Sequence, residues 1–124
     1  MKKWIFLLCF TPFLMAMQCN EDDENQVNCT MEARAGLNIT VQDAVTHAVL
    51  TEGVSVVATE GAYSEMLELF TGSDVFSGAW ERRGNYILTV SKSGYQTHTS
   101  ETITVTADVC HVIPQNRTVQ LIPQ

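Results

Sequence analysis

The feature that most constrains this chain is a series of short apolar–polar alternations bounded by glycines or polar turns. Residues 37–42, 54–59 and 86–90 place apolar, often β-branched side chains at every second position. Successive side chains of a β-strand point to opposite faces, so a period of two predicts strands with one buried face. Gly53, Gly84 and Gly94 lie at the ends of these segments, where turns are expected.

The spacing of these segments predicts an all-β fold. Residues 75–80 are predicted as a further strand, and alternating stretches also occupy residues 102–106 and 118–122. Residues 65–70 fit a strand or a helical turn, and we interpret them as a strand because the segment is short for a helix. About seven short strands, roughly ten residues apart, are typical of an antiparallel β-sandwich such as the Ig-like fold. A length of 124 residues suits one such domain.

The strand motifs follow one another in an order that resembles a known family. Val-x-Asp-Ala, Gly-Val-x-Val, Gly-x-Tyr-x-Leu-x-Val and a Gly-Tyr turn across residues 35–122 resemble the carboxypeptidase regulatory-like domain. The resemblance implies a transthyretin-like sandwich over residues 29–124. It implies no activity, because the family's zinc and glutamate lie in a separate domain. Residues 46–49 replace the usual Gly-x-Pro, so this loop is expected to differ. The matching residues are Val41, Asp43, Ala44, Gly53, Val54, Val56, Gly84, Tyr86, Leu88, Val90, Gly94 and Tyr95.

The N-terminal stretch predicts export. Lys2 and Lys3 precede a mostly apolar run that reaches Met17, which is the arrangement of a secretory signal peptide. A membrane span needs roughly 20 apolar residues, and Thr11 and Pro12 interrupt this run. We therefore assign residues 1–18 to a signal peptide, with an N-terminal anchor helix as the competing interpretation.

The sequence around Cys19 and the number of cysteines indicate lipidation. Residues 16–19, Ala-Met-Gln-Cys, resemble a bacterial lipobox, whose cysteine becomes the lipidated first residue, although Gln is unusual before it. Ordinary cleavage behind Ala16 is the alternative. Export removes Cys9 and leaves three cysteines, and lipidation of Cys19 turns this odd number into one pair. We therefore predict a lipoprotein of the bacterial cell envelope, held to the membrane through Cys19.

An acidic segment follows Cys19. Four consecutive acids occupy residues 21–24 within a polar stretch that cannot bury apolar surface. We expect residues 19–28 to be a disordered tether. The run also resembles the surface-export signal of Bacteroidetes-type lipoproteins, which predicts an outer-membrane lipoprotein whose domain faces outward. A plain solvated linker is the alternative.

The two remaining cysteines are expected to pair. Cys29 lies just before the first predicted strand and Cys110 before the last, and a sandwich could bring these positions together. An exported chain oxidises such a pair readily. We predict a Cys29–Cys110 disulfide, with two free buried cysteines as the alternative.

Charge and motif content predict neither an enzyme nor a nucleic-acid binder. The formal net charge is −7, whereas phosphate backbones require a basic face. His47, His98 and His111 lie in no His-Glu-x-x-His pattern or other metal-ligand spacing, and we expect them to be exposed or in turns. No Gly-x-Ser-x-Gly elbow or phosphate-binding glycine loop occurs. We therefore expect no catalytic residue, metal or cofactor.

Four side chains are candidates for ligand contact. Arg82 and Arg83 follow Glu81 and could receive a carboxylate or an anionic sugar, or form a solvated turn. Trp80 and Tyr63 lie near loops and could stack on a sugar, or pack in the core or at an edge. The leading hypothesis is a non-enzymatic lipoprotein with one interaction or structural module. The alternatives are a carbohydrate or peptide binder and an unrecognised hydrolase, and any protein or glycan partner is unidentified.

Overall fold

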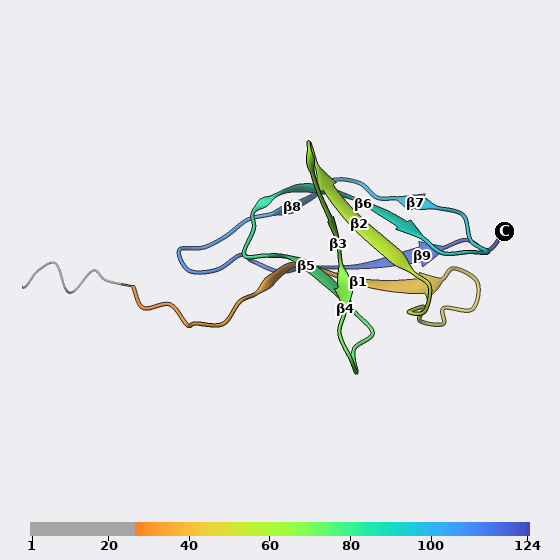
Figure 1. Cartoon of the computed structure of the whole chain (residues 1–124), viewed down its shortest axis with the longest axis horizontal. Helices are drawn as coiled ribbons and strands as arrows, with labels where there is room; N and C mark the ends of the chain where they lie inside the picture. Colours follow the sequence, from red (N-terminus) through yellow and green to blue (C-terminus); the bar gives the residue numbers. More distant parts are fainter. Residues whose placement is uncertain (1–26) are drawn as a thin grey trace, which may run out of the picture.

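The computed structural model describes residues 27–124, which form nine β-strands and no helix (Figure 1). Within this range, no segment has the length and apolarity of a membrane-spanning helix. The predicted signal peptide, Cys19 and most of the predicted tether lie outside the described residues. The strands are β1 (Ala35–Asp43), β2 (Ser55–Glu60), β3 (Tyr63–Met66), β4 (Glu68–Leu69), β5 (Phe76–Trp80), β6 (Gly84–Ser91), β7 (His98–Thr99), β8 (Ile103–Val105) and β9 (Gln115–Leu121).

The strands form two sheets that pack face to face, which confirms the predicted all-β sandwich. Sheet A has the order β4-β5-β1-β9, and sheet B has the order β3-β2-β6-β7, with β8 also paired to β6. The described pairs are antiparallel except for β1 and β9, which run parallel from the pair Leu37–Gln115 to the pair Asp43–Leu121. Parallel neighbours cannot be joined by a tight hairpin. Here the whole of sheet B intervenes between β1 and β9.

The core lies between the sheets and consists of the inward-facing half of each alternating segment. Residues 37, 39 and 41 of β1 and residues 86, 88 and 90 of β6 are fully buried, as their period of two predicts. Burying one such side chain contributes roughly 1.5–3 kcal/mol. The largest fully buried side chains are Tyr86, Leu37, Ile39, Leu88, Leu121, Val41, Val56, Val90 and Val105.

The two long sides of the sandwich are built differently. On one side, β3 of sheet B continues through buried Leu67 into β4 of sheet A, so one short segment joins the sheets. On the other side, β9 is the edge of sheet A, while β7 and β8 border sheet B. This second side therefore leaves a strand edge open to solvent.

The structure shows which conformation residues 65–70 adopt, and some strands differ in their bounds from the prediction. Residues 65–70 contribute to β3 and β4, which confirms the strand interpretation over the helical one. β7 is an additional strand, and β9 begins at Gln115, ahead of the predicted start. Residues 115–117 are polar, so apolar alternation did not indicate this part of the strand.

The turn after β1 is stabilised by Asp43. Its Oδ1 accepts hydrogen bonds from the backbone N–H groups of Thr46 (2.9 Å) and Val45 (2.7 Å), and its Oδ2 accepts one from the Tyr95 hydroxyl (2.7 Å). These bonds, with Thr46 first, hold the pKa of Asp43 below its usual value. The carboxylate thus joins the predicted turn to the segment just beyond the turn that follows β6.

Candidate functional site

The end of the sandwich where the N-terminal segment enters is held by a disulfide. Cys29 and Cys110 are bonded. Their Cα atoms are 5.3 Å apart, and their sequence separation is 81. This confirms the predicted pair. The bond ties the segment before β1 to the loop before β9.

His111 binds Thr30 and Glu81 beside this disulfide, and we call these three side chains the latch. Nδ1 of His111 lies 2.5 Å from Oε2 of Glu81, and its Nε2 lies 2.9 Å from Oγ1 of Thr30. His111 lies in the bend before β9, which is one of the two expected placements, but it is not exposed, since only 8% of its surface is accessible. Burial of an imidazole requires partners for both ring nitrogens, and the two neighbouring segments supply them. By contrast, His47 is exposed in a turn and His98 is half-buried in β7.

Glu81 is the centre of this latch. Its carboxylate accepts hydrogen bonds from the backbone N–H groups of Val112 and Arg34, each at 3.0 Å. The bond to His111, followed by the bond to Val112, lowers the pKa of Glu81 below its usual value. Because the ionised carboxylate of Glu81 can only accept, Nδ1 of His111 donates to it, and Nε2 shares the second bond with the Thr30 hydroxyl. A hydroxyl, an imidazole and a carboxylate thus stand in series, and together they join three separate chain segments.

The loop that carries Cys110 is capped by an aspartate. Oδ1 of Asp108 accepts hydrogen bonds from the backbone N–H groups of Cys110 and His111, both at 2.8 Å. These bonds, with His111 first, lower the pKa of Asp108. A hollow of about 400 Å³ beside this loop is lined by Glu81, Arg83 and residues 107–112. Of the four predicted ligand contacts, only Arg83 lies there.

Arg82 contacts three side chains of the same domain. Its Nη1 donates to Oε1 of Glu60 (2.9 Å) and to the Tyr86 hydroxyl (2.8 Å), and its guanidinium lies 3.5 Å from the ring centre of Tyr63. The Tyr63 hydroxyl donates to Oε1 of Glu65 at 2.6 Å, which raises the pKa of Tyr63 to about 12. Tyr63 and Arg82 therefore contact each other, and each is also bonded to an acidic side chain of the domain.

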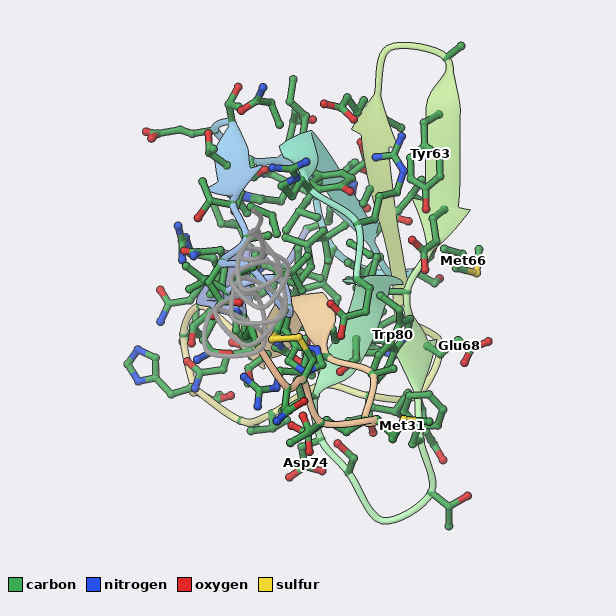
Figure 2. The ribbon with its side chains drawn as sticks, turned by 90° about the vertical axis from the view of Figure 1, so that its left-hand side faces the viewer. Met31, Tyr63, Met66, Glu68, Asp74 and Trp80 are labelled. Carbon is green, nitrogen blue, oxygen red and sulfur yellow. A yellow bond between two sulfur atoms is a disulfide. The ribbon has the colours of Figure 1, made fainter. Side chains whose placement is uncertain are left out.

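Trp80 points away from this cluster. Ala79 has a positive φ of 55° and is fully buried, so the strand alternation breaks and Trp80 turns outward. Trp80 is 42% exposed and Phe70 is 48% exposed, and their rings meet edge to face at 6.1 Å. Trp80, Met66 and Glu68 lie along one flank of the molecule in Figure 2. Trp80 therefore pairs with Phe70, whereas Tyr63 pairs with Arg82.

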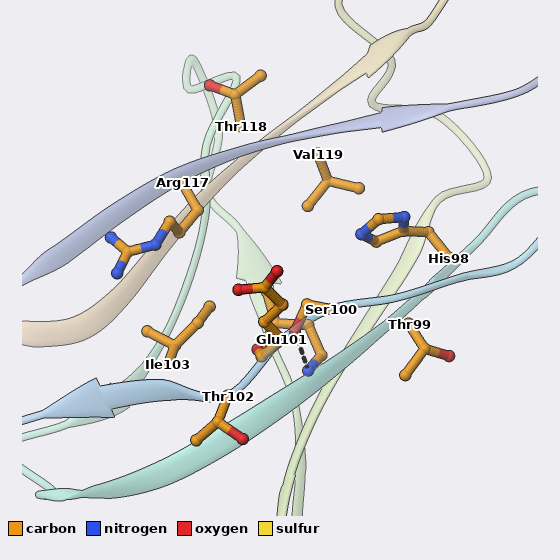
Figure 3. A pocket seen from close by; sticks show the side chains of 10 residues that line it. His98, Thr99, Ser100, Glu101, Thr102, Ile103, Arg117, Thr118 and Val119 are labelled. Carbon is orange, nitrogen blue, oxygen red and sulfur yellow. Dashed lines mark hydrogen bonds between the residues drawn. The ribbon is translucent and has the colours of Figure 1, made fainter.

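A groove runs along the open side of the sandwich, between β9 and the β7–β8 segment. It has a volume of about 470 Å³ and includes Leu88, Ile103 and Val119 among its lining residues. Figure 3 shows Arg117 and Val119 on the groove side of β9 and Thr118 on the opposite side. The other lining residues have polar or charged side chains.

The outward face of sheet A carries a side-chain ladder that the sequence analysis missed. The parallel register places Asn38 beside Asn116, Thr40 beside Thr118, and Gln42 beside Gln120. Identical residues face each other because β1 and β9 share the pattern Asn-x-Thr-Val-Gln, at residues 38–42 and 116–120. This short repeat is the signal that could have revealed both the ladder and the parallel pairing.

Comparisons with known proteins identify no relative. No protein-family model matches the chain, and no curated protein is similar to it in sequence. Among residues 27–124, no group of three or more histidine, cysteine or acidic side chains is placed to hold a metal ion.

Proposed function

We propose that this chain is a non-enzymatic lipoprotein of the bacterial cell envelope, anchored through Cys19, whose β-sandwich is an interaction module. The observation that supports an interaction role most directly is the exposed aromatic pair of Phe70 and Trp80. Large aromatic side chains are favoured in binding surfaces because they bury much area and lose little conformational freedom.

The polar side chains of the domain support the same proposal. His111, Glu81 and Thr30 bind one another and connect three segments, and Arg82 is held by Glu60 and Tyr86. These contacts give the side chains a structural role in holding the fold together. A role for the domain is then better sought on its outer surface than in these clusters.

The interaction role is tested by photocrosslinking in intact cells. Benzoylphenylalanine placed at position 70 should give a crosslinked adduct of higher mass. The same group at position 87 is the control, because Ile87 is 40% exposed on β6 of the other sheet. Equal crosslinking at both positions, or none at position 70, contradicts an interaction surface on sheet A.

The anchor is tested separately by Cys19→Ser. The unmodified protein should fractionate with membranes and the variant with the soluble envelope contents, because the variant lacks the lipid acceptor. If both proteins are soluble, the lipoprotein proposal fails while the crosslinking result still stands.

Orientation is tested with protease added to whole cells. We propose that the acids at residues 21–24 direct the domain to the cell surface, so replacing all four by alanine should protect the domain from the protease. If the unmodified domain already resists while a known surface protein is digested, the domain faces inward and the acidic run is a linker.

A further inference from the structure

We propose that the outward face of sheet A is a binding platform for a neutral polysaccharide, a chain of uncharged sugars. The platform consists of the Asn-Thr-Gln ladder of β1 and β9 together with Ser77, Phe70 and Trp80. This inference rests on the proposed function and names the ligand class of its interaction surface.

The ladder is a regular array of hydrogen-bonding groups. The rung Asn38–Asn116 is followed by the rungs Thr40–Thr118 and Gln42–Gln120. Ser77 on β5 pairs with Asn38 but is only 9% exposed, so it supports the Asn38 side chain from within the sheet. Neighbouring strands lie about 4.8 Å apart, and alternate residues of one strand lie about 6.8 Å apart. Sugar hydroxyl groups repeat along a polysaccharide on a similar scale, so one extended chain can meet several rungs.

The ladder side chains match the chemistry of sugar hydroxyls. Each amide both donates and accepts hydrogen bonds, and each hydroxyl does the same. Within the platform, Ser77 donates to Oδ1 of Asn38 at 3.0 Å, and Nε2 of Gln120 lies 3.4 Å from Oε1 of Gln42. Among residues 27–124, the side chains of Asn116, Thr40 and Thr118 show no hydrogen bond to the protein. Their capacity remains for a ligand.

The aromatic pair supplies the apolar part of the platform. The register places Glu68 opposite Ser77 and Leu69 opposite Phe76, so Phe70 continues on the outward side of β4. Trp80 reaches this side through the reversed alternation at Ala79 and contacts Phe70. The flat C–H faces of sugar rings pack on aromatic rings, while the indole N–H can donate to a hydroxyl.

The charge of the domain favours a neutral sugar chain over an anionic polymer as the ligand. From Cys29 onward the chain carries five basic and ten acidic residues, so the domain repels polyanions. The outward positions of β1, β5 and β9 that form the ladder hold only amides and hydroxyls, and the adjoining Glu68 on β4 is acidic. Among residues 27–124, the ladder positions offer no cation to an anionic glycan or a nucleic acid.

The experiment is affinity electrophoresis of the full chain carrying Cys19→Ser, in native gels that contain one polysaccharide each. The neutral probes are mixed-linkage β-glucan, xyloglucan, galactomannan and dextran, and the anionic probe is alginate. We expect at least one neutral probe to slow migration, and alginate to have no effect.

Two variants and two matched controls locate the site. Trp80→Ala should weaken binding by about tenfold or more, as expected for loss of one buried aromatic anchor, and Thr118→Ala should weaken it to a smaller extent. Ile87→Ala and Thr89→Ala change an exposed apolar and a hydroxyl side chain on the other sheet, and should bind like the unmodified chain. Circular dichroism confirms that each variant is folded.

Three outcomes overturn the proposal: no retardation by any neutral probe, retardation by alginate alone, or equal binding by Trp80→Ala and the unmodified chain. If position 70 still crosslinks in cells when the neutral probes fail, the interaction module survives and its ligand is a protein. If neither experiment gives a signal, the proposed function fails as well.

Discussion

Removal of the Cys29–Cys110 disulfide is the most informative perturbation of this fold. The bond closes a loop across 81 positions of sequence, which spans most of the domain. Chain-entropy arguments for a loop of this size give a stabilisation of about 4.5 kcal/mol. For a domain of this size, 1 kcal/mol shifts the melting temperature by roughly 4–8 °C. The double variant Cys29→Ser and Cys110→Ser should therefore melt about 18–36 °C lower.

The assay is calorimetry of the secreted Cys19→Ser chain, with and without the two further substitutions. The unreduced protein should contain no titratable thiol from Cys29 and Cys110 after denaturation, and reduction should expose both. Thr30→Ala is the matched control, because it breaks the hydrogen bond to His111 next to the disulfide but leaves the covalent loop closed. Its loss of melting temperature should be a small fraction of that of the double variant.

Two results would refute this reasoning. If the double variant melts within about 3 °C of the intact protein, closure of the loop does not restrict the unfolded chain as assumed. If Thr30→Ala costs as much as the double variant, the hydrogen-bonded latch and not the covalent bond holds this end of the sandwich.

Three further predictions test the polar and packing contacts. Glu81→Gln should lower stability at pH 7 and flatten its decline on acidification in urea titrations. Because folding lowers the pKa of Glu81, the stabilisation by its carboxylate is fully present above the ordinary carboxyl pKa of about 4.3. This stabilisation is lost as the pH falls through the lower pKa of the folded state. Gly36→Ala should cost up to about 3 kcal/mol in the same titrations, because its Cβ would lie 2.8 Å from Cγ1 of Val105 in the core. Gly61→Ala has open space and should cost about 1 kcal/mol, through its positive φ alone. Arg82→Lys should lower the urea midpoint, because lysine cannot reproduce the guanidinium fork and stack, and an unchanged midpoint would contradict this.

The strands were predictable because alternation is a local property of the chain. In residues 37–42 and 86–90 each apolar side chain lies two positions from the next, and burial of one sheet face requires that spacing. The disulfide was predictable for a different reason, since the cysteine count left one plausible pair.

The polar contacts were not predictable in the same way, because they join residues far apart in sequence. His111 is 30 positions from Glu81 and 81 from Thr30, so no local pattern marks its burial. Trp80 and Arg82 are near neighbours in sequence, yet the positive φ at Ala79 sends them to different environments. No local pattern in the sequence marks this break in alternation, so both residues were candidates for ligand contact.

The parallel pairing of β1 and β9 also bears on how an anchored domain would carry load. If Cys19 is held in a membrane as proposed, tension reaches the domain at Cys29. The disulfide passes part of this tension to Cys110, which lies shortly before β9. Both strands are then loaded at their N-terminal ends, and because they run parallel, they are pulled in the same direction and are not sheared past each other. The same two strands carry the Asn-Thr-Gln ladder, so the tether and the disulfide would preserve the register on which the platform depends.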